Sequence, residues 1–179
     1  MRTEDLWVFG YGSLMWNPGF EHTEAVVATL PGYHRSFCMR SIHHRGTEDA
    51  PGLVLALDEM SGAHCQGLAF RACPHSHEKT LADLRERELV SSAYLEKRLT
   101  IALRDGREVE AVTYVIDPDH VQYCQIDLEE QARIIAYAVG GRGANTEYLY
   151  NTAAHLTDLG IEDQDLNWLA HRVREQAAT

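Results

Sequence analysis

One acidic side chain falls where a predicted helix should face the protein core. Residues 76–90 are typical of a helix, whose period of 3.6 residues places His77, Leu81, Leu84 and Glu88 on one face. The two leucines are expected to point inward, so Glu88 is drawn inward with them at the end of the helix. Burial makes a carboxylate easier to protonate and so useful for proton transfer near pH 7. Glu88 is therefore a candidate general base and acid.

An ordinary interpretation of Glu88 is also open. At the frayed end of a helix, the carboxylate can pair with Lys97 or Arg98 at the surface. Many amphipathic helices contain such imperfect positions. Periodicity alone favours this surface ion pair and leaves the catalytic role as the alternative.

A glycine-containing loop near the N-terminus is the second place where chemistry is possible. It follows residues 6–9, an apolar and aromatic run typical of a strand. Gly10 and Gly12 break the strand pattern, and glycine permits a positive φ or the close approach of another group. Ser13 adds a hydroxyl, and successive main-chain N–H groups after a strand can form a nest for a carboxylate. The ordinary alternative is a strand that ends in a tight turn.

Other catalytic templates fit the loop poorly. Ser13 is not in a Gly-x-Ser-x-Gly elbow, because Met15 occupies the last position. Gly10 and Gly12 lack the third glycine of a dinucleotide-binding loop. The sequence also contains no phosphate-binding Gly-x-x-x-x-Gly-Lys motif and no His-Glu-x-x-His zinc motif.

The cysteines do not form a metal-binding pattern. The chain has 4 cysteines and no Cys-x-x-Cys pair, so we expect reduced thiols rather than a disulfide framework. Cys65, Cys73, His75 and His77 lie in a short span, but their spacing matches no common zinc site. We therefore expect no metal.

Length and charge narrow the possible partners. The 179 residues suffice for a single domain over 1–179, and a net charge of -11 argues against nucleic-acid binding. No apolar run approaches the ~20 residues that span a membrane. The N-terminus leads into the first strand without a signal-peptide core, so we expect a cytoplasmic protein.

Strand patterns dominate the first two thirds of the chain and helical patterns the last third. The sequence predicts an α+β domain: a β-sheet or small barrel, an inserted helix, and packed C-terminal helices. An Asp-Gly turn at 105–106 predicts a hairpin. Asp127 and Asn145 are predicted helix caps. Strands are predicted at 6–9, 24–40 (one or two), 53–57, 65–70, 94–103 and 109–116, and helices at 76–90 and from about 127, 145 and 163.

Residues 8–20, Val-Phe-Gly-Tyr-Gly-Ser-Leu-Met-Trp-Asn-Pro-Gly-Phe, resemble the opening motif of the ChaC-type γ-glutamylcyclotransferases. The resemblance covers nearly the whole chain in order. It continues at 32–37, 44–47, 51–55, Arg87-Glu88 with Tyr94, 145–149, 155–156 and 159–161.

The resemblance implies a fold and a reaction. The fold is the γ-glutamylcyclotransferase-like α+β fold, a small mixed barrel with helices around it. The reaction is intramolecular aminolysis, in which the α-amino group of a γ-glutamyl residue attacks its own γ-carbonyl. For glutathione the products are 5-oxoproline and cysteinylglycine. Ring closure requires no metal or cofactor.

The resemblance also assigns roles to residues. Glu88 is the general base and acid, and the loop holds the γ-glutamyl group. Tyr94 orients Glu88 or contacts the substrate, and Arg40 and Ser41 lie in a loop that can face the glycine end of glutathione. For each of these residues a structural hydrogen bond is an equal alternative. Tyr123 is a further candidate, although Cys124-Gln125 replaces the glycine that many relatives carry after this tyrosine. The predicted substrate-binding residues are Gly10, Tyr11, Gly12, Ser13, Leu14, Met15, Arg40, Ser41, Tyr94 and Tyr123.

Two further functions remain open. One is a cyclotransferase that acts on other γ-glutamyl amines or amino acids, with the same loop and Glu88. The other is a non-catalytic γ-glutamyl-binding regulator, which would not need an inward carboxylate. We expect glutathione to be the partner of a monomer or a weak homodimer.

Overall fold

The protein divides into two compact units. The computed structural model describes residues 5–88 and 93–177, except for the side chains of Ser13, Arg87, Glu88 and Ala177. The first unit comprises Met1–Arg35 and Leu57–His120, and the second comprises Ser36–Ala56 and Val121–Thr179. Strands β2 (His22–Ser41) and β3 (Gly52–Ala72) each run from one unit into the other. The single domain expected over 1–179 remains a prediction.

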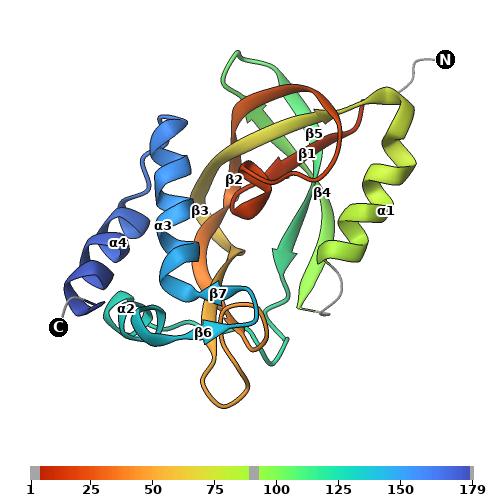
Figure 1. The fold of residues 1–179 in the computed structure, drawn as a ribbon. Helices are drawn as coiled ribbons and strands as arrows, with labels where there is room; N and C mark the ends of the chain where they lie inside the picture. The colour runs from red at the N-terminus through yellow and green to blue at the C-terminus, as the bar shows by residue number, and fades with distance from the viewer. Residues whose placement is uncertain (1–4, 89–92, 178–179) are drawn as a thin grey trace. The chain divides into compact units, whose positions relative to one another are not determined.

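A closed barrel forms the sheet of this protein (Figure 1). Its strand order is β1-β3-β2-β4-β5, where β1 is Trp7–Gly10, β4 is Tyr94–Leu103 and β5 is Glu108–Ile116. β1 runs antiparallel to β3 on one side and parallel to β5 on the other, with Trp7 opposite Ala111. All four residues of β1 are buried, because both of its edges are paired and both of its faces are covered.

The predicted hairpin and most predicted strands are confirmed. β4 and β5 pair over their length around Gly106, whose φ of 98° only glycine adopts readily. The division into strands at 53–57 and 65–70 is wrong, because β3 continues through both. Its middle is polar and exposed, and Gly62 accommodates a φ of 85° there without ending the strand.

The helix inserted after β3 presents the predicted face to the core. A short 3₁₀ turn η2 (Pro74–Ser76) leads into α1 (His77–Glu88). Leu84 is 2% exposed and belongs to a cluster with Leu14 and Tyr114, while Leu81 packs against that cluster. The last turn of α1 therefore carries its apolar side chain onto the residues that follow β1.

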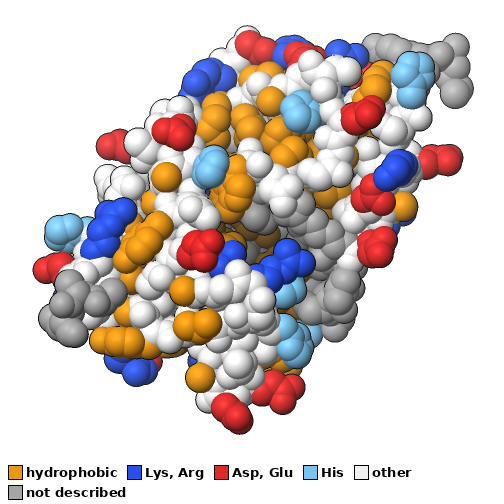
Figure 2. All heavy atoms as spheres, viewed as in Figure 1, with side chains coloured by type: hydrophobic (Ala, Val, Ile, Leu, Met, Phe, Trp, Pro, Cys, Tyr) orange, Lys and Arg blue, Asp and Glu red, His pale blue; other side chains and the backbone are white. Residues whose placement is uncertain are grey.

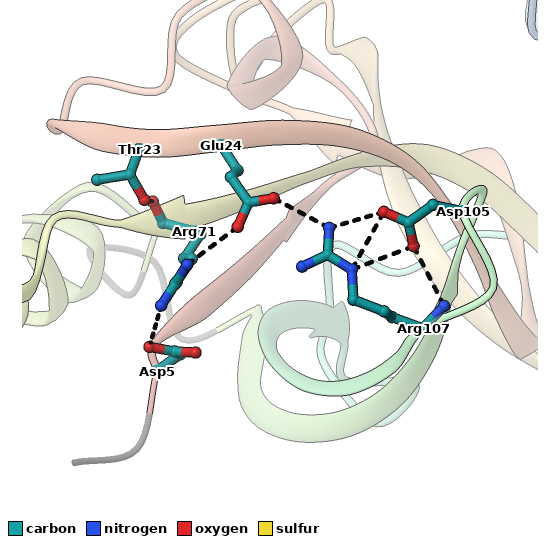
Figure 3. Close-up of polar contacts among 6 residues, drawn as sticks. All are labelled: Asp5, Thr23, Glu24, Arg71, Asp105 and Arg107. Atoms are coloured by element: carbon teal, nitrogen blue, oxygen red, sulfur yellow. Dashed lines mark hydrogen bonds and ion pairs between the residues drawn. The ribbon is translucent and has the colours of Figure 1, made fainter. Parts of the chain in front are cut away.

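Charged side chains tie the strands of the first unit together at its surface (Figure 3). Arg71 lies 2.8 Å from Asp5 and 3.1 Å from Glu24. Arg107 lies 2.9 Å from Glu24 and 2.7 Å from Asp105. Glu24 is thus shared between Arg71 of β3 and Arg107 of the turn that precedes β5. Side chains of both charges are spread over the face drawn in Figure 2.

We expect Glu24→Gln to lower stability at pH 7 and to lose that effect in acid. Hydrogen bonds from Arg107, and then from Arg71, hold the pKa of Glu24 below its ordinary value. Such a carboxylate stabilises the folded state above its unfolded pKa of about 4.3, and the contribution disappears as the pH falls through the lower folded pKa. Urea unfolding at pH 7 and at several values below about 4 measures the difference.

The same change at Glu59, an exposed carboxylate of β3, serves as the control and should leave stability unaltered. A difference between wild type and Glu24→Gln that persists undiminished in strong acid would contradict the ion-pair explanation.

Three helices make up most of the second unit. They are α2 (Leu128–Tyr137), α3 (Asn145–Asp158) and α4 (Gln164–Ala177), and each contacts the other two. Ile135, Leu149 and Val173 are fully buried. Arg172 of α4 donates to Glu129 of α2 at 2.9 Å. Each helix thus contributes a fully buried apolar side chain to the core of this unit.

One predicted helix cap is confirmed and the other is wrong. The Asp127 carboxylate accepts the Glu130 N–H at 2.8 Å and so caps α2. Asn145 is instead the first residue of α3, and its fully buried side chain accepts from the Leu53 N–H and donates to the Leu53 carbonyl. The amide satisfies a strand backbone rather than a helix end, because it matches both polar groups of one residue. The sequence also misses a small hairpin of β6 (Val139–Gly140) and β7 (Gly143–Ala144), whose strands are only 2 residues long.

Candidate active site

The loop after β1 is buried and tightly wound. It forms the 3₁₀ turn η1 (Ser13–Met15), in which the Met15 N–H donates to the Gly12 carbonyl at 2.9 Å. Tyr11, Leu14 and Met15 are all buried. The strand therefore ends in a compact turn, as expected, and most of the turn is removed from water.

Gly10 is required for space and not for a positive φ. Of the two uses of glycine considered from the sequence, a positive φ does not apply to Gly10, and close approach does. A Cβ at this position would lie 2.9 Å from the Cβ of Leu14, a distance that real Cβ atoms essentially never show. The absence of a side chain at Gly10 lets η1 fold back onto the end of β1.

A buried arginine on β2 holds the loop by a hydrogen bond. Arg35 is 3% exposed, and its Nε donates to the Tyr11 carbonyl at 2.9 Å. Its Nη2 donates to the Gln66 carbonyl of β3. The planar guanidinium thus fixes the loop backbone relative to the neighbouring strand. Arg35 is not among the residues predicted for the site, but the alternation of Tyr33, Arg35 and Phe37 along a strand places it on the buried face with two aromatic residues.

The opposite side of the loop is tied to β5. The Tyr11 hydroxyl donates to the Tyr114 carbonyl at 3.1 Å. The Thr113 hydroxyl donates to the Phe9 carbonyl at 3.1 Å. The predicted substrate-binding loop is therefore anchored to β2, β3 and β5 before any substrate arrives, which suits a preorganised site.

Glu88 is the last residue of α1, and its side chain lies outside the described part of the chain. Both interpretations of this carboxylate consequently remain predictions. Leu84, one helical turn earlier, belongs to the same buried cluster as Leu14 of the loop, and Tyr94 packs against that cluster. The structure thus brings together the loop, the last turn of α1 and Tyr94.

A polar network runs beside this cluster. Arg85, also in the last turn of α1, donates to both oxygens of Glu96 on β4, at 2.9 and 3.0 Å. The hydroxyl of Tyr114 donates to the same carboxylate at 2.8 Å. The hydrogen bonds from the Arg85 guanidinium hold the pKa of Glu96 below its ordinary value. Burial acts in the opposite direction, and the hydrogen bond from Tyr114 lowers the pKa further. Periodicity cannot reveal this network, because it joins a helix to a strand beyond it.

The remaining predicted residues lie together in the second unit. The Arg40 N–H donates to the Gln122 carbonyl at 2.8 Å, and Met39 forms a β-bridge with Tyr123. Ser41 is buried, and its hydroxyl oxygen accepts the Arg45 N–H at 2.9 Å. Arg40, Ser41 and Tyr123 are therefore neighbours through backbone pairing, although Tyr123 is distant from the other two in the sequence. This hydrogen bond shapes the loop that follows Ser41.

The turn after Ser41 is held by a second arginine. The Arg45 guanidinium donates to the Ala144 carbonyl at 3.1 Å and lies 5.6 Å from the centre of the Tyr148 ring. A Cβ on Gly140 would lie 2.4 Å from the Gly46 nitrogen, so the turn packs directly on β6. The small hairpin that the sequence misses is thus the support for this loop.

Among the residues described, no three His, Cys, Asp or Glu side chains gather in a way that could hold a metal ion. All four cysteines are free thiols, and burial raises the pKa of Cys124. Within the described ranges, none of the helices has the length and apolar character to cross a membrane.

Comparison with solved structures identifies the class of fold. A crystal structure of a γ-glutamyl cyclotransferase specific to glutathione, from yeast, superimposes with a TM-score of 0.86 over 97% of both chains, at 22% identity. A second solved structure, a γ-glutamyl cyclotransferase, gives a TM-score of 0.58 over 93% of this chain and 86% of its own, at 16% identity. The barrel with its helices is therefore the γ-glutamylcyclotransferase fold, as expected.

Comparison of sequences narrows this class to a family. The model of the ChaC-like protein family matches residues 6–176, and the chain belongs to that family. A glutathione-specific γ-glutamylcyclotransferase of Escherichia coli K12 is 41% identical over 97% of this chain and 74% of its own length. γ-Glutamylcyclotransferase 2-1 of Arabidopsis thaliana is 34% identical over 96% of this chain and 83% of its own. The glutathione-specific γ-glutamylcyclotransferase 1 of Danio rerio is 36% identical over 83% and 77%.

Proposed function

We propose that this protein is a γ-glutamylcyclotransferase that degrades glutathione to 5-oxoproline and cysteinylglycine. The observation that carries the proposal is the buried, arginine-held loop of residues 10–15 beside the last turn of α1 in a ChaC-like chain. Relatives named as glutathione-specific cyclotransferases, at up to 41% identity among those above, support glutathione as the substrate.

The proposed reaction needs one proton-transfer group. At pH 7 the α-amino group of the γ-glutamyl moiety is an ammonium and cannot attack its γ-carbonyl until it loses a proton. We assign Glu88 to accept that proton and to deliver one to the leaving nitrogen. The bond from the α-nitrogen to the γ-carbonyl carbon forms, the original amide bond at that carbon breaks, and 5-oxoproline and cysteinylglycine separate without any other reactant.

The loop supplies the other half of the chemistry. We assign the backbone of Gly10–Met15, with the Ser13 hydroxyl, to hold the γ-glutamyl group and to stabilise the carbonyl oxygen as it gains charge. Holding the substrate folded back on itself lowers the entropic barrier to ring closure. The rigidity of the loop, which Arg35 and Tyr11 fix through their hydrogen bonds, supports this role.

Further residues keep their predicted roles within this proposal. Tyr94 orients Glu88 or contacts the substrate. Arg40, Ser41 and Tyr123 contact the substrate, with Arg40 suited to a carboxylate. We also propose that the protein acts in the cytoplasm as a monomer or weak homodimer, and its four free thiols agree with a reducing compartment.

Incubation with glutathione and, separately, with γ-glutamyl-alanine tests the proposal. Mass spectrometry should detect 5-oxoproline from glutathione, with cysteinylglycine in equal amount. Formation of 5-oxoproline only from γ-glutamyl-alanine would favour the alternative of a cyclotransferase for other γ-glutamyl compounds. A rise in melting temperature with glutathione, but no product from either compound, would contradict the proposed enzymatic activity. That result would favour the non-catalytic γ-glutamyl-binding regulator.

A further inference from the structure

The network of Arg85, Glu96 and Tyr114 spans the two halves of the proposed active site. Arg85 stands three residues before Glu88 in the last turn of α1. Glu96 and Tyr114 are directly opposite one another on the paired strands β4 and β5. The network therefore links the end of the helix to the barrel wall at a defined register.

The geometry of the Arg85–Glu96 pair fixes orientation as well as distance. Both oxygens of the carboxylate accept from the guanidinium, at 2.9 and 3.0 Å, so the two planes are held side by side. Arg85 is half exposed whereas Glu96 is only 21% exposed, so the anchor lies on the strand. The Tyr114 hydroxyl, 2.8 Å from Glu96, prevents the carboxylate from turning away.

Tyr114 connects the Arg85–Glu96 pair, which we call the clamp, to the loop of residues 10–15. Its side chain is 2% exposed and belongs to the cluster that contains Leu14 and Leu84. Its hydroxyl donates to Glu96, while its own carbonyl accepts the Tyr11 hydroxyl at 3.1 Å. The buried Tyr114 thus contacts both Glu96, the strand member of the pair, and the loop that follows β1.

The geometry points to Arg85 and Glu96 as positioning residues that hold the last turn of α1, and with it Glu88, at a fixed distance from the substrate-binding loop. This inference rests on the proposed function for the role of Glu88. Neither residue needs to touch the substrate. An ion pair with a half-exposed arginine contributes little to folding stability, so replacing Arg85 should leave the protein folded and misplace the helix end. Small displacements of a reacting group cost much in rate.

The test compares Arg85→Met, Glu96→Gln and the double variant with the wild type. Arg85→Met should lower kcat for glutathione about tenfold and change KM less than about twofold, because substrate binding to the loop is unaffected. The double variant should be little worse than either single one, since both changes break the same contact. Arg85→Lys keeps the positive charge but cannot donate to both carboxylate oxygens in the same geometry. Its kcat should lie between that of the wild type and that of Arg85→Met.

Lys79→Met is the matched control. Lys79 also carries a charge on α1, but its partner Asp83, at 2.8 Å, lies on the same helix. Loss of that pair cannot release the helix from the barrel, so kcat should equal that of the wild type. Equal kcat in Arg85→Met and Lys79→Met would overturn the inference, as would fully additive losses in the double variant.

Amide hydrogen exchange separates this inference from the proposed function. The last turn of α1 should exchange faster in Arg85→Met than in the wild type and Lys79→Met, whether or not the protein turns over glutathione. If the wild type forms no 5-oxoproline, the proposed function fails, and the clamp is judged by exchange alone. Unchanged exchange in Arg85→Met would overturn the clamp itself.

Discussion

Replacing Glu88 with glutamine should abolish the formation of 5-oxoproline and leave the protein folded. Glutamine has nearly the same shape but cannot accept a proton from the substrate ammonium. The α-amino group therefore stays protonated and has no electron pair with which to attack the γ-carbonyl. General acid–base catalysis typically contributes about 10²–10⁴-fold, and we expect a loss of kcat in that range. Mass spectrometry of 5-oxoproline measures the loss, and the melting temperature monitors folding.

The matched control is Glu86→Gln. Glu86 is exposed on the same helix, and the same chemical change there should leave turnover intact. The binding of glutathione to Glu88→Gln, followed by its thermal shift, should persist because the loop is untouched. Normal turnover by Glu88→Gln would show that another group is the base and would favour the surface ion pair with Lys97 or Arg98.

Gly67→Ala should have the second largest effect, although it changes a residue outside the loop. A Cβ at this position would lie 2.3 Å from the Gly10 carbonyl oxygen and 2.8 Å from the tip of the Phe9 ring. A backbone oxygen cannot move aside alone, so the end of β1 must shift and displace the start of the loop. Overpacking of this kind costs about 1–3 kcal/mol of stability, which urea unfolding measures.

Activity should fall more steeply than stability in this variant. We expect kcat/KM for glutathione to decrease at least about tenfold at a temperature where circular dichroism shows the variant to be folded. Gln66→Ala is the control, because its side chain is exposed and its backbone carbonyl still accepts from Arg35. Wild-type activity in folded Gly67→Ala would mean that the loop tolerates displacement.

The sequence predicts the parts of this fold that depend on local periodicity. The inward face of α1 at Leu81 and Leu84, the hairpin around Gly106 and the cap at Asp127 are all confirmed. Each depends on a pattern within a few residues. The continuous β3 is not predicted, since a polar, glycine-containing segment is typical both of a turn and of an exposed stretch of strand.

The candidate site is predictable only in part, for a related reason. The sequence identifies the loop and the end of α1, but not the contacts that hold them. Arg35 appears in sequence as one more basic residue on a strand, and its grip on Tyr11 requires the tertiary fold. By its residue type, Asn145 is suited both to capping a helix and to bonding a strand backbone. Only the tertiary fold, which places Leu53 beside it, shows that it does the second. Alternation along β2 can place Arg35 on the buried face, but it cannot identify the distant backbone groups to which the side chain donates.

The parallel pairing of β1 with β5 has a consequence for the order of events on the ribosome. β1 emerges first, yet one of its two neighbours, β5, is among the last strands of the barrel to be synthesised. Until Glu108–Ile116 arrive, the apolar residues of β1 have an open edge on that side, and Tyr11 lacks the carbonyl to which it donates. Contacts so far apart in sequence form slowly. The predicted substrate-binding loop is thus completed only when the barrel closes, so a nascent or truncated chain that lacks β5 carries the sequence of the loop without its shape.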